Sequence, residues 1–127
     1  METDRRDEFD KLKQDQENKV CCDCGNTKYK RIANAAPQWA SINNGIFICF
    51  NCSAVHRAFG AHISSVRSLN MDAWDDKRIA FMQNGGNRKF KAFMASYDLE
   101  TVLALVKYKT KAADYYRRRV IWMRVCS

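Results

Sequence analysis

Two pairs of cysteines are the residues of this sequence best suited to chemistry. Cys21 and Cys24 form one C-x2-C pair, and Cys49 and Cys52 form a second. Because only two residues separate the members of a pair, both sulfurs can bind one ion, and four thiolates complete the tetrahedral shell of zinc. A complete shell leaves no open position that could activate water. The two pairs therefore predict one structural zinc ion as a cofactor.

The remaining cysteines and histidines are weaker candidates for metal binding. A redox C-x-x-C motif and unrelated buried cysteines are the alternatives to zinc, and a single pair would leave them open. Cys22 lies between two expected ligands and Cys126 has no partner pair, so we expect neither to bind the ion. His56 or His62 could replace a cysteine. With four paired cysteines present, we expect both histidines to be structural or to support the ligands through hydrogen bonds.

Composition places the chain among soluble globular proteins. Its 127 residues are 46% hydrophobic and 28% charged, with one Pro and five Gly, which predicts one domain over residues 1–127 without a low-complexity linker. The start, METDRRDEFD, is too charged for a secretion signal, and the longest apolar run, IFICF, is too short to span a membrane. We therefore expect a cytoplasmic location, where cysteines stay reduced.

The chain is basic, with a net charge of +8 from 22 Lys+Arg and 14 Asp+Glu. This excess favours a negatively charged partner: a nucleic acid, an anionic membrane or an acidic protein face. Much of it lies in KYKTKAADYYRRRV. Basic and aromatic side chains in and just after this segment predict weak contact with an anionic membrane, namely Tyr115, Tyr116, Arg117, Arg118, Arg119 and Trp122. The alternative is a helix end whose cations complement the helix dipole.

The first half of the chain predicts a helix and then a turn before a short strand. Residues 4–18 have the pattern of a surface helix with a thin apolar stripe, mainly Phe9 and Leu12. The Asn44-Gly45 pair before the β-rich run IFICF predicts a turn followed by a buried strand.

The second half predicts mainly helices. Three polar residues are expected to cap them: Ser53 for a short helix that stops at Gly60, Asp72 for one that ends at residues 84–86, and Asn87 for a third. Roughly helical spacing of apolar residues continues after Thr101. The fold class predicted from these elements is α+β, a small β-sheet with a four-cysteine zinc finger, surrounded by several α-helices.

These motifs together resemble a known family, the zinc-dependent GTPase-activating domains that act on Arf-type small GTPases (ArfGAP domains). The matching segments cover nearly the whole chain, and they are NKVCCDCG (18–25), PQWASINNGIFICFNCS (37–53), HRAFGAHISSVRSLNMDAW (56–74) and GGNRKF (85–90). The resemblance implies a domain core at about residues 18–120 and a GTP-bound Arf-family GTPase as the partner. It also implies that the chain is not itself an enzyme but completes the active site of that GTPase.

Within the family, the sequence is most similar to the Golgi-associated branch, whose catalytic domain is N-terminal. This similarity implies a role in vesicle transport and recruitment from the cytoplasm to Golgi or vesicle membranes. Two features differ from the family pattern. The family usually has fewer residues between the cysteine pairs than the 24 found here, and the surplus lies in NTKYKRIANAA between Gly25 and Pro37. In CSAVHR, Ala54 and Val55 replace a common glycine and arginine.

The resemblance assigns Arg57 the role of an arginine finger, a guanidinium supplied to the active site of a GTPase. GTP hydrolysis spreads negative charge over the γ-phosphoryl group and the leaving oxygen, and a planar, forked cation can bind several of these oxygens. Arg57 follows Cys52 by about one and a half helical turns, so a zinc site would hold the start of its helix. The alternative is an exposed arginine in a salt bridge. The sequence contains no G-x-x-x-x-G-K-[ST] loop, so nucleotide and magnesium are expected on the partner.

Three further residues are candidates for partner binding: Trp39, Arg67 and Asp72. An aromatic residue just after a proline usually serves packing, but the resemblance implies that Trp39 supports the finger. Arg67 is a second basic residue near the same region, and an ion pair with Asp72 is its expected structural role.

Two rival functions remain open from the sequence. A four-cysteine finger could bind nucleic acid, but the basic residues are scattered and SAVHRAFG carries one permanent cation, whereas a recognition helix presents several polar or basic side chains. We therefore expect no nucleic-acid partner. An adaptor could bind the GTPase without accelerating hydrolysis, and it would not need Arg57. We expect the domain to be a monomer.

Overall fold

Three short antiparallel strands form the centre of the molecule, which is a computed structural model describing residues 2–25 and 37–126. The strands lie in the order β2-β1-β3, with bounds β1 (Trp39–Ser41), β2 (Ile46–Ile48) and β3 (Val66–Ser68). The insertion expected between Gly25 and Pro37 lies outside the described residues.

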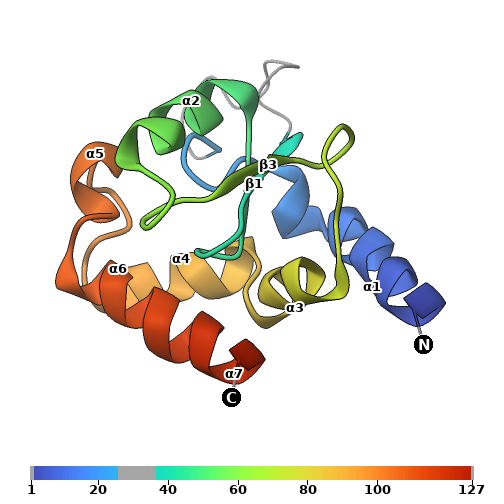
Figure 1. Cartoon of the computed structure of the whole chain (residues 1–127). Coiled ribbons are helices and arrows are strands. Elements are labelled where there is room, and N and C mark those ends of the chain that lie inside the picture. Colours follow the sequence, from blue (N-terminus) through green and yellow to red (C-terminus); the bar gives the residue numbers. More distant parts are fainter. Residues whose placement is uncertain (1, 26–36, 127) are drawn as a thin grey trace.

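Helices lie on both sides of this sheet (Figure 1). In Figure 1, α2 lies above the sheet, α3 and α4 lie below it, and the C-terminal helices run along the lower edge. Their bounds are α1 (Glu2–Gln14), the 3-10 helix η1 (Gln16–Lys19), α2 (Phe50–Phe59), α3 (Asp76–Asn84), α4 (Asn87–Ser96), α5 (Ala104–Lys107), α6 (Lys111–Tyr115), the π-helix η3 (Tyr116–Trp122) and α7 (Met123–Cys126). The predicted α+β class, a small sheet surrounded by helices, is confirmed. No described helix is both long and apolar enough to cross a membrane.

The core forms where apolar side chains from both sides meet the sheet. All of β2 is buried, as the IFICF run predicted. Phe9 is a buried residue of α1, and its ring lies 4.5 Å from that of Trp74, so the thin stripe of this helix docks on the chain before α3. The Phe90 ring, from α4, stacks on Tyr108 at 5.4 Å.

Two turns cross each other so closely that neither has room for a side chain. Gly45, in the turn before β2, has a φ of 65°, which favours glycine. A Cβ on Gly85, at the end of α3, would lie 2.7 Å from the carbonyl oxygen of Gly45. The same oxygen accepts a 2.7 Å hydrogen bond from the N–H of Gly86. The hairpin and the α3–α4 junction are therefore in direct backbone contact.

Two helices begin elsewhere than their predicted caps. Helix α2 starts at Phe50 with Cys49 as its cap, whereas Ser53 lies inside the helix and donates to the Phe50 carbonyl. The end of this helix at Gly60 agrees with the prediction. Helix α3 is capped by Asp75 rather than Asp72. Here a second aspartate three residues later takes the capping role.

Asn87 was expected to cap α4 but instead lies in the helix, after Gly86. Its side chain is fully buried and connects separate segments: it accepts from the N–H of Phe47 at 2.7 Å and donates to the carbonyl of Val20 at 2.8 Å. Its own N–H donates to the Asn18 side chain. Asn87 thereby joins β2 to the chain just before the first cysteine pair.

Candidate metal centre and arginine site

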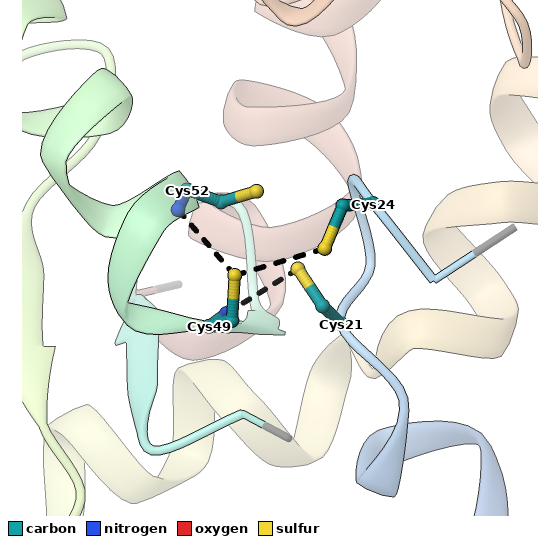
Figure 2. A group of neighbouring side chains, drawn as sticks. All are labelled: Cys21, Cys24, Cys49 and Cys52. Atoms are coloured by element: carbon teal, nitrogen blue, oxygen red, sulfur yellow. Dashed lines mark hydrogen bonds between the residues drawn. The ribbon is translucent and has the colours of Figure 1, made fainter. Parts of the chain in front are cut away.

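Four cysteines converge from two parts of the chain. Cys21 and Cys24 lie in the turn after η1, and Cys49 and Cys52 lie at the start of α2 (Figure 2). All four sulfurs lie within 4.8 Å of one another. The structure therefore brings together the four residues that the sequence predicted as metal ligands.

The arrangement fits a tetrahedral ion with sulfur ligands. Zinc–sulfur bonds of about 2.3 Å place neighbouring sulfurs about 3.8 Å apart, and the sulfurs of Cys24 and Cys49 are separated by 3.7 Å. Backbone N–H groups also point at the sulfurs: Cys49 donates to Cys21 Sγ at 3.3 Å, and Cys52 donates to Cys49 Sγ at 3.5 Å. Such donors stabilise thiolates, the form that binds metal.

The thiols influence one another strongly. Hydrogen bonding from Cys52 lowers the pKa of Cys21 to about 5, against the opposing effect of burial. Burial and the neighbouring Cys21 raise the pKa of Cys24 to about 12. The hydrogen bond to Cys21, together with burial, also raises the pKa of Cys52. One thiolate is thus stabilised at the expense of its neighbours, and a cation is needed to hold four sulfurs as thiolates together.

The four cysteines and histidines expected to stay off the ion have different surroundings. Cys22 is buried outside the cluster of four. The side chain of Cys126 lies outside the described residues. His62 is exposed on the turn after α2, and His56 is fully buried with hydrogen bonds on both ring nitrogens.

Arg57 lies in the last turn of α2 and is exposed to solvent. Its guanidinium carbon lies 4.6 Å from the centre of the Trp39 ring, which provides a cation–π contact. The Trp39 ring in turn lies 6.1 Å from that of Phe50. Trp39 therefore contacts Arg57, while its predicted role in supporting an arginine finger stays a prediction.

The residue beside Arg57 is fixed by buried hydrogen bonds. His56 Nε2 lies 2.7 Å from Asp23 Oδ2, and the other oxygen of Asp23 accepts from the Tyr108 hydroxyl. Asp23 sits between the first two cysteines in the sequence. Because a carboxylate only accepts, His56 Nε2 must donate, and Nδ1 then accepts from the hydroxyl of Ser64 at 2.7 Å. Sequence reasoning missed this network, for which the acidic residue between two ligands was the available signal.

The hydrogen bonds continue to the C-terminal helices. Ser64 Oγ lies 2.6 Å from Ser41 Oγ, which accepts from the side-chain amide of Asn44 at 2.8 Å. Arg117 donates to the oxygen of that amide at 3.2 Å and to the Tyr108 carbonyl at 3.1 Å. Arg117 is buried, and burial lowers its pKa from the ordinary value. Arg117 is therefore a structural residue at the base of the basic segment rather than part of its outer surface.

Arg67 and Asp72 lie on and after β3. Arg67 donates to the Ala73 carbonyl at 3.4 Å, and Asp72 accepts from the N–H of Ser68 at 2.7 Å. Among the ion pairs of the described residues, none joins these two side chains, so the expected pairing is wrong. Asp72 is occupied by a tight turn, which keeps its carboxylate on the backbone of Ser68.

Comparison with known proteins agrees with this architecture. A family model described as "Putative GTPase activating protein for Arf" (ArfGap) matches residues 6–123. ADP-ribosylation factor GTPase-activating protein 3 from Bos taurus is 37% identical over 113 residues, which are 88% of this chain and 20% of that protein. The chain thus spans about a fifth of the length of this curated relative.

Two solved structures share the fold. The crystal structure of a "putative GTPase activating protein for ADP ribosylation factor" from Cryptosporidium parvum has a TM-score of 0.78 and 25% identity, and covers 98% of this chain and 94% of its own. The ArfGap domain of HIV-1 Rev binding protein has a TM-score of 0.62 and 19% identity, covers 98% of this chain and 88% of its own, and supports the fold alone. With the family model matched over nearly the whole sequence, the chain belongs to the ArfGap family.

Proposed function

We propose that this domain stimulates GTP hydrolysis by an Arf-family small GTPase in its GTP-bound state. It acts as an activator that completes the active site of its partner and is not an enzyme alone. Family membership and the similarity to ADP-ribosylation factor GTPase-activating protein 3 support this assignment.

One observation carries the proposal: an exposed arginine stands on a helix that is held at both ends. The first turn of α2 begins at the cysteine cluster, since Cys49 caps the helix. The last turn is held through His56, whose side chain is 0% exposed and bonded to Asp23 and Ser64. Arg57 is the neighbour of His56 and points to solvent, so it can reach a second protein from a rigid base.

The chemistry suits a guanidinium in this position. The transition state of GTP hydrolysis carries charge on the γ-phosphoryl oxygens and the leaving oxygen, and catalysis depends on positioning and neutralising that charge. Arg57 would donate hydrogen bonds to these oxygens, and such a residue contributes roughly 10³–10⁵ in rate. The Trp39 ring beneath the guanidinium restricts its movement before the partner binds.

The four cysteines would hold one structural zinc ion. Zinc with four thiolates stabilises the fold and offers no open position for a substrate. Its contribution here is to join the Cys21–Cys24 turn to the start of α2, so that the two segments flanking Asp23 and His56 keep a fixed separation.

Trp39, Arg67 and Asp72 are proposed to lie on the partner-binding side. Trp39 and Arg67 come from neighbouring strands, since Ala40, next to Trp39, pairs with Arg67. Asp72 then acts indirectly, because its bond to Ser68 shapes the turn that follows β3.

The setting of the activity is a separate proposal. We propose that the domain is a cytoplasmic monomer that acts at Golgi or vesicle membranes in vesicle transport. Fluorescence imaging of the tagged chain beside a Golgi marker, and mass measurement in solution, test these two statements. A diffuse or nuclear signal would contradict the first, and a stable dimer would contradict the second.

The decisive experiment compares Arg57→Lys with the parent in single-turnover hydrolysis by a GTP-loaded Arf-type GTPase. Lysine keeps the charge and the helix but cannot form the forked contact, so we expect a loss of about 10²–10³ in the stimulated rate with little loss of GTPase binding.

Arg67→Lys is the matched control. Its single 3.4 Å bond to a carbonyl can also be made by lysine, so most of the stimulation should remain. Full stimulation by Arg57→Lys would show that the domain is an adaptor or that another arginine acts. Equal losses in both variants would point to general damage to the interface.

A further inference from the structure

A wide cleft lies between the turn that follows α2 and the C-terminal helices. Its volume is about 930 Å³. On one side it is lined by Asn43, His62 and Ile63, and on the other by Lys109, Thr110, Lys111, Asp114, Arg117, Arg118, Arg119, Trp122 and Met123. Four of these residues, Arg117, Arg118, Arg119 and Trp122, belong to the segment whose sequence predicts weak contact with an anionic membrane.

The lining is strongly basic. Four exposed permanent cations line the cleft (Lys109, Lys111, Arg118 and Arg119) and buried Arg117 lies at its base, against Asp114 as the one acidic residue among the described lining residues. Asp114 is itself neutralised, because it accepts from Arg118 at 3.1 Å and lies 4.0 Å from Arg117. The cleft therefore has a net positive field that its own carboxylate does not cancel.

The walls of the cleft are held in place by backbone and side-chain bonds. Asn43 donates to the Ala61 carbonyl at 3.0 Å and accepts from the N–H of Ser65 at 2.9 Å, which fixes the loop that carries His62. On the opposite wall, buried Arg117 bonds to Asn44, the neighbour of Asn43. The two walls are thus joined at the base, and the cleft is a fixed feature of the fold.

A π-helix produces the basic wall. Residues Tyr116–Trp122 form η3, whose wider turn changes which residues share a face. Arg118 and Arg119 are adjacent in sequence, yet both line the cleft together with Trp122 and Met123. Trp122 and Met123 are 50% and 45% exposed. The wall thus combines guanidinium groups with an apolar edge.

The size and charge of the cleft together select a class of ligand. A single phosphate would occupy a small part of a cleft in the upper range of small-molecule sites. Arginine and lysine side chains spread along one wall match several phosphates on one molecule, which guanidinium groups bind through paired hydrogen bonds. The exposed Trp122 beside them is the kind of residue that lies at the level of lipid headgroups.

We propose that this cleft binds clustered phosphate groups carried on a sugar-like ring, as in the headgroup of a multiply phosphorylated phosphoinositide or in a free inositol polyphosphate. Binding would hold the basic face of the domain against an anionic surface. The proposal is independent of the activity proposed above.

The test compares a cleft variant with a charge-matched control. Lys111→Glu combined with Arg119→Glu reverses two exposed cations of the cleft, and Lys11→Glu combined with Arg88→Glu makes the same change on exposed residues of α1 and α4. Calorimetric titration with inositol trisphosphate measures free ligand. Co-sedimentation measures binding to vesicles of phosphatidylcholine that contain phosphatidylinositol bisphosphate, and compares it with binding to vesicles that contain phosphatidylserine at equal total charge.

We expect the parent and the control variant to bind the bisphosphate vesicles and prefer them to phosphatidylserine vesicles. The cleft variant should bind about tenfold more weakly or worse. Cleft-dependent binding of inositol trisphosphate would identify the phosphates alone as sufficient, whereas cleft-dependent binding to vesicles only would identify the lipid as the source. Equal weakening in both variants, or no preference over phosphatidylserine, would overturn the proposal. Circular dichroism and zinc content verify that the variants are folded, and stimulation of a soluble GTPase should be unchanged in the cleft variant.

Discussion

Helix α2 and the C-terminal stretch of α6 and η3 both carry exposed arginines, but they are built differently. In α2 a single exposed arginine, Arg57, follows a histidine whose ring bonds at both nitrogens inside the core. In the C-terminal stretch, Arg118 and Arg119 stand side by side on a π-helix and face an open cleft. Arg118 is 76% exposed, with Asp114 as its partner one turn earlier.

The difference separates two uses of the same side chain. A group that stabilises a transition state must be placed to within a fraction of an ångström, so it needs rigid neighbours. Groups that bind a polyanion act through their summed field and tolerate movement. On this basis α2 is suited to catalysis in a partner, and the C-terminal stretch is suited to electrostatic binding.

Loss of the metal should have the largest effect, because α2 begins at two of its ligands. Cys52→Ser, or a strong chelator, is expected to unfold the domain and abolish stimulation, since the binding energy of a structural zinc is folding energy. Metal analysis and circular dichroism before and after chelation measure this. Cys22→Ala is the control, buried but outside the cluster of four, and it should keep the metal. A chelated domain that keeps its helices would show that α2 is held without the ion.

Removal of the His56 side chain, which fixes the last turn of α2 beside Arg57, should have the second-largest effect. His56→Ala leaves Asp23 and Ser64 without a buried partner, at a cost of about 2–4 kcal/mol in the free energy of unfolding. At a temperature where the variant is folded, we also expect stimulation to fall by about tenfold, because the last turn of α2 is no longer fixed. Thermal unfolding and single-turnover hydrolysis measure the two effects.

Tyr108→Phe separates positioning from stability. It removes a different bond to the same Asp23 carboxylate and keeps the ring that packs against His56. We expect it to cost about 1–2 kcal/mol in stability and to leave stimulation of the folded protein intact. If both variants stimulate equally well when folded, His56 serves stability alone.

The contact between Arg57 and Trp39 should have a smaller effect. Trp39→Leu keeps apolar bulk but removes the aromatic face, which is worth about 0.5–1 kcal/mol at an exposed site. A loss of stimulation of about two- to fivefold is expected. Phe50→Leu is the control, since Phe50 is 59% exposed and touches Trp39 rather than the guanidinium. A larger loss from Phe50→Leu would make Phe50 the more important partner contact.

The smallest expected effect is a change of stability with pH, and it arises from two buried tyrosines in the C-terminal part of the chain. Burial raises the pKa values of Tyr108 and Tyr116 above their ordinary value. These tyrosines ionise near pH 10 in the unfolded chain while the folded protein keeps both protons, so their contribution to stability should be constant below that pH and fall above it.

Tyr116→Phe tests this decline. Among the described residues, the Tyr116 hydroxyl is buried without a hydrogen-bond partner, so its removal should change stability at neutral pH by less than about 1 kcal/mol. Urea unfolding at neutral and alkaline pH should show a shallower alkaline decline in the variant. If the loss of stability at alkaline pH is the same in Tyr116→Phe as in the parent, groups other than Tyr116 cause it.

The sequence predicted what depends on spacing and missed what depends on distant contacts. The C-x2-C pairs predicted the cluster, because the spacing lets both sulfurs of each pair bind one ion and four thiolates complete its shell. Gly60 predicted the end of α2. The predicted start of α2 is wrong because the helix is capped by the sulfur of Cys49, which accepts from the N–H of Cys52, and not by the hydroxyl of Ser53. Asp72 and Asp75 are equivalent by local rules, and only the fold decides which one caps.

The hydrogen-bond network beside Arg57 could not be predicted from the sequence. Asp23 and Tyr108 are 85 residues apart in the chain, and their contact exists only after the C-terminal helices have packed on the sheet. The π-helix is also invisible to apolar periodicity, which assumes a regular turn. Residue types could suggest a role for Arg57, but only the fold shows that its neighbour His56 is bonded inside the core, whereas Arg118 pairs with Asp114 at the surface.

The crossing of Gly45 with Gly85 has a consequence for how the chain folds. Phe47 and Asn87, which bond beside this crossing, are 40 residues apart in the sequence, so each contact closes a long loop at an entropic cost. The backbones can meet only when the hairpin turn and the end of α3 both exist. We therefore expect this contact to form after the local helices, and a side chain at Gly85 to slow folding as well as weaken the native state.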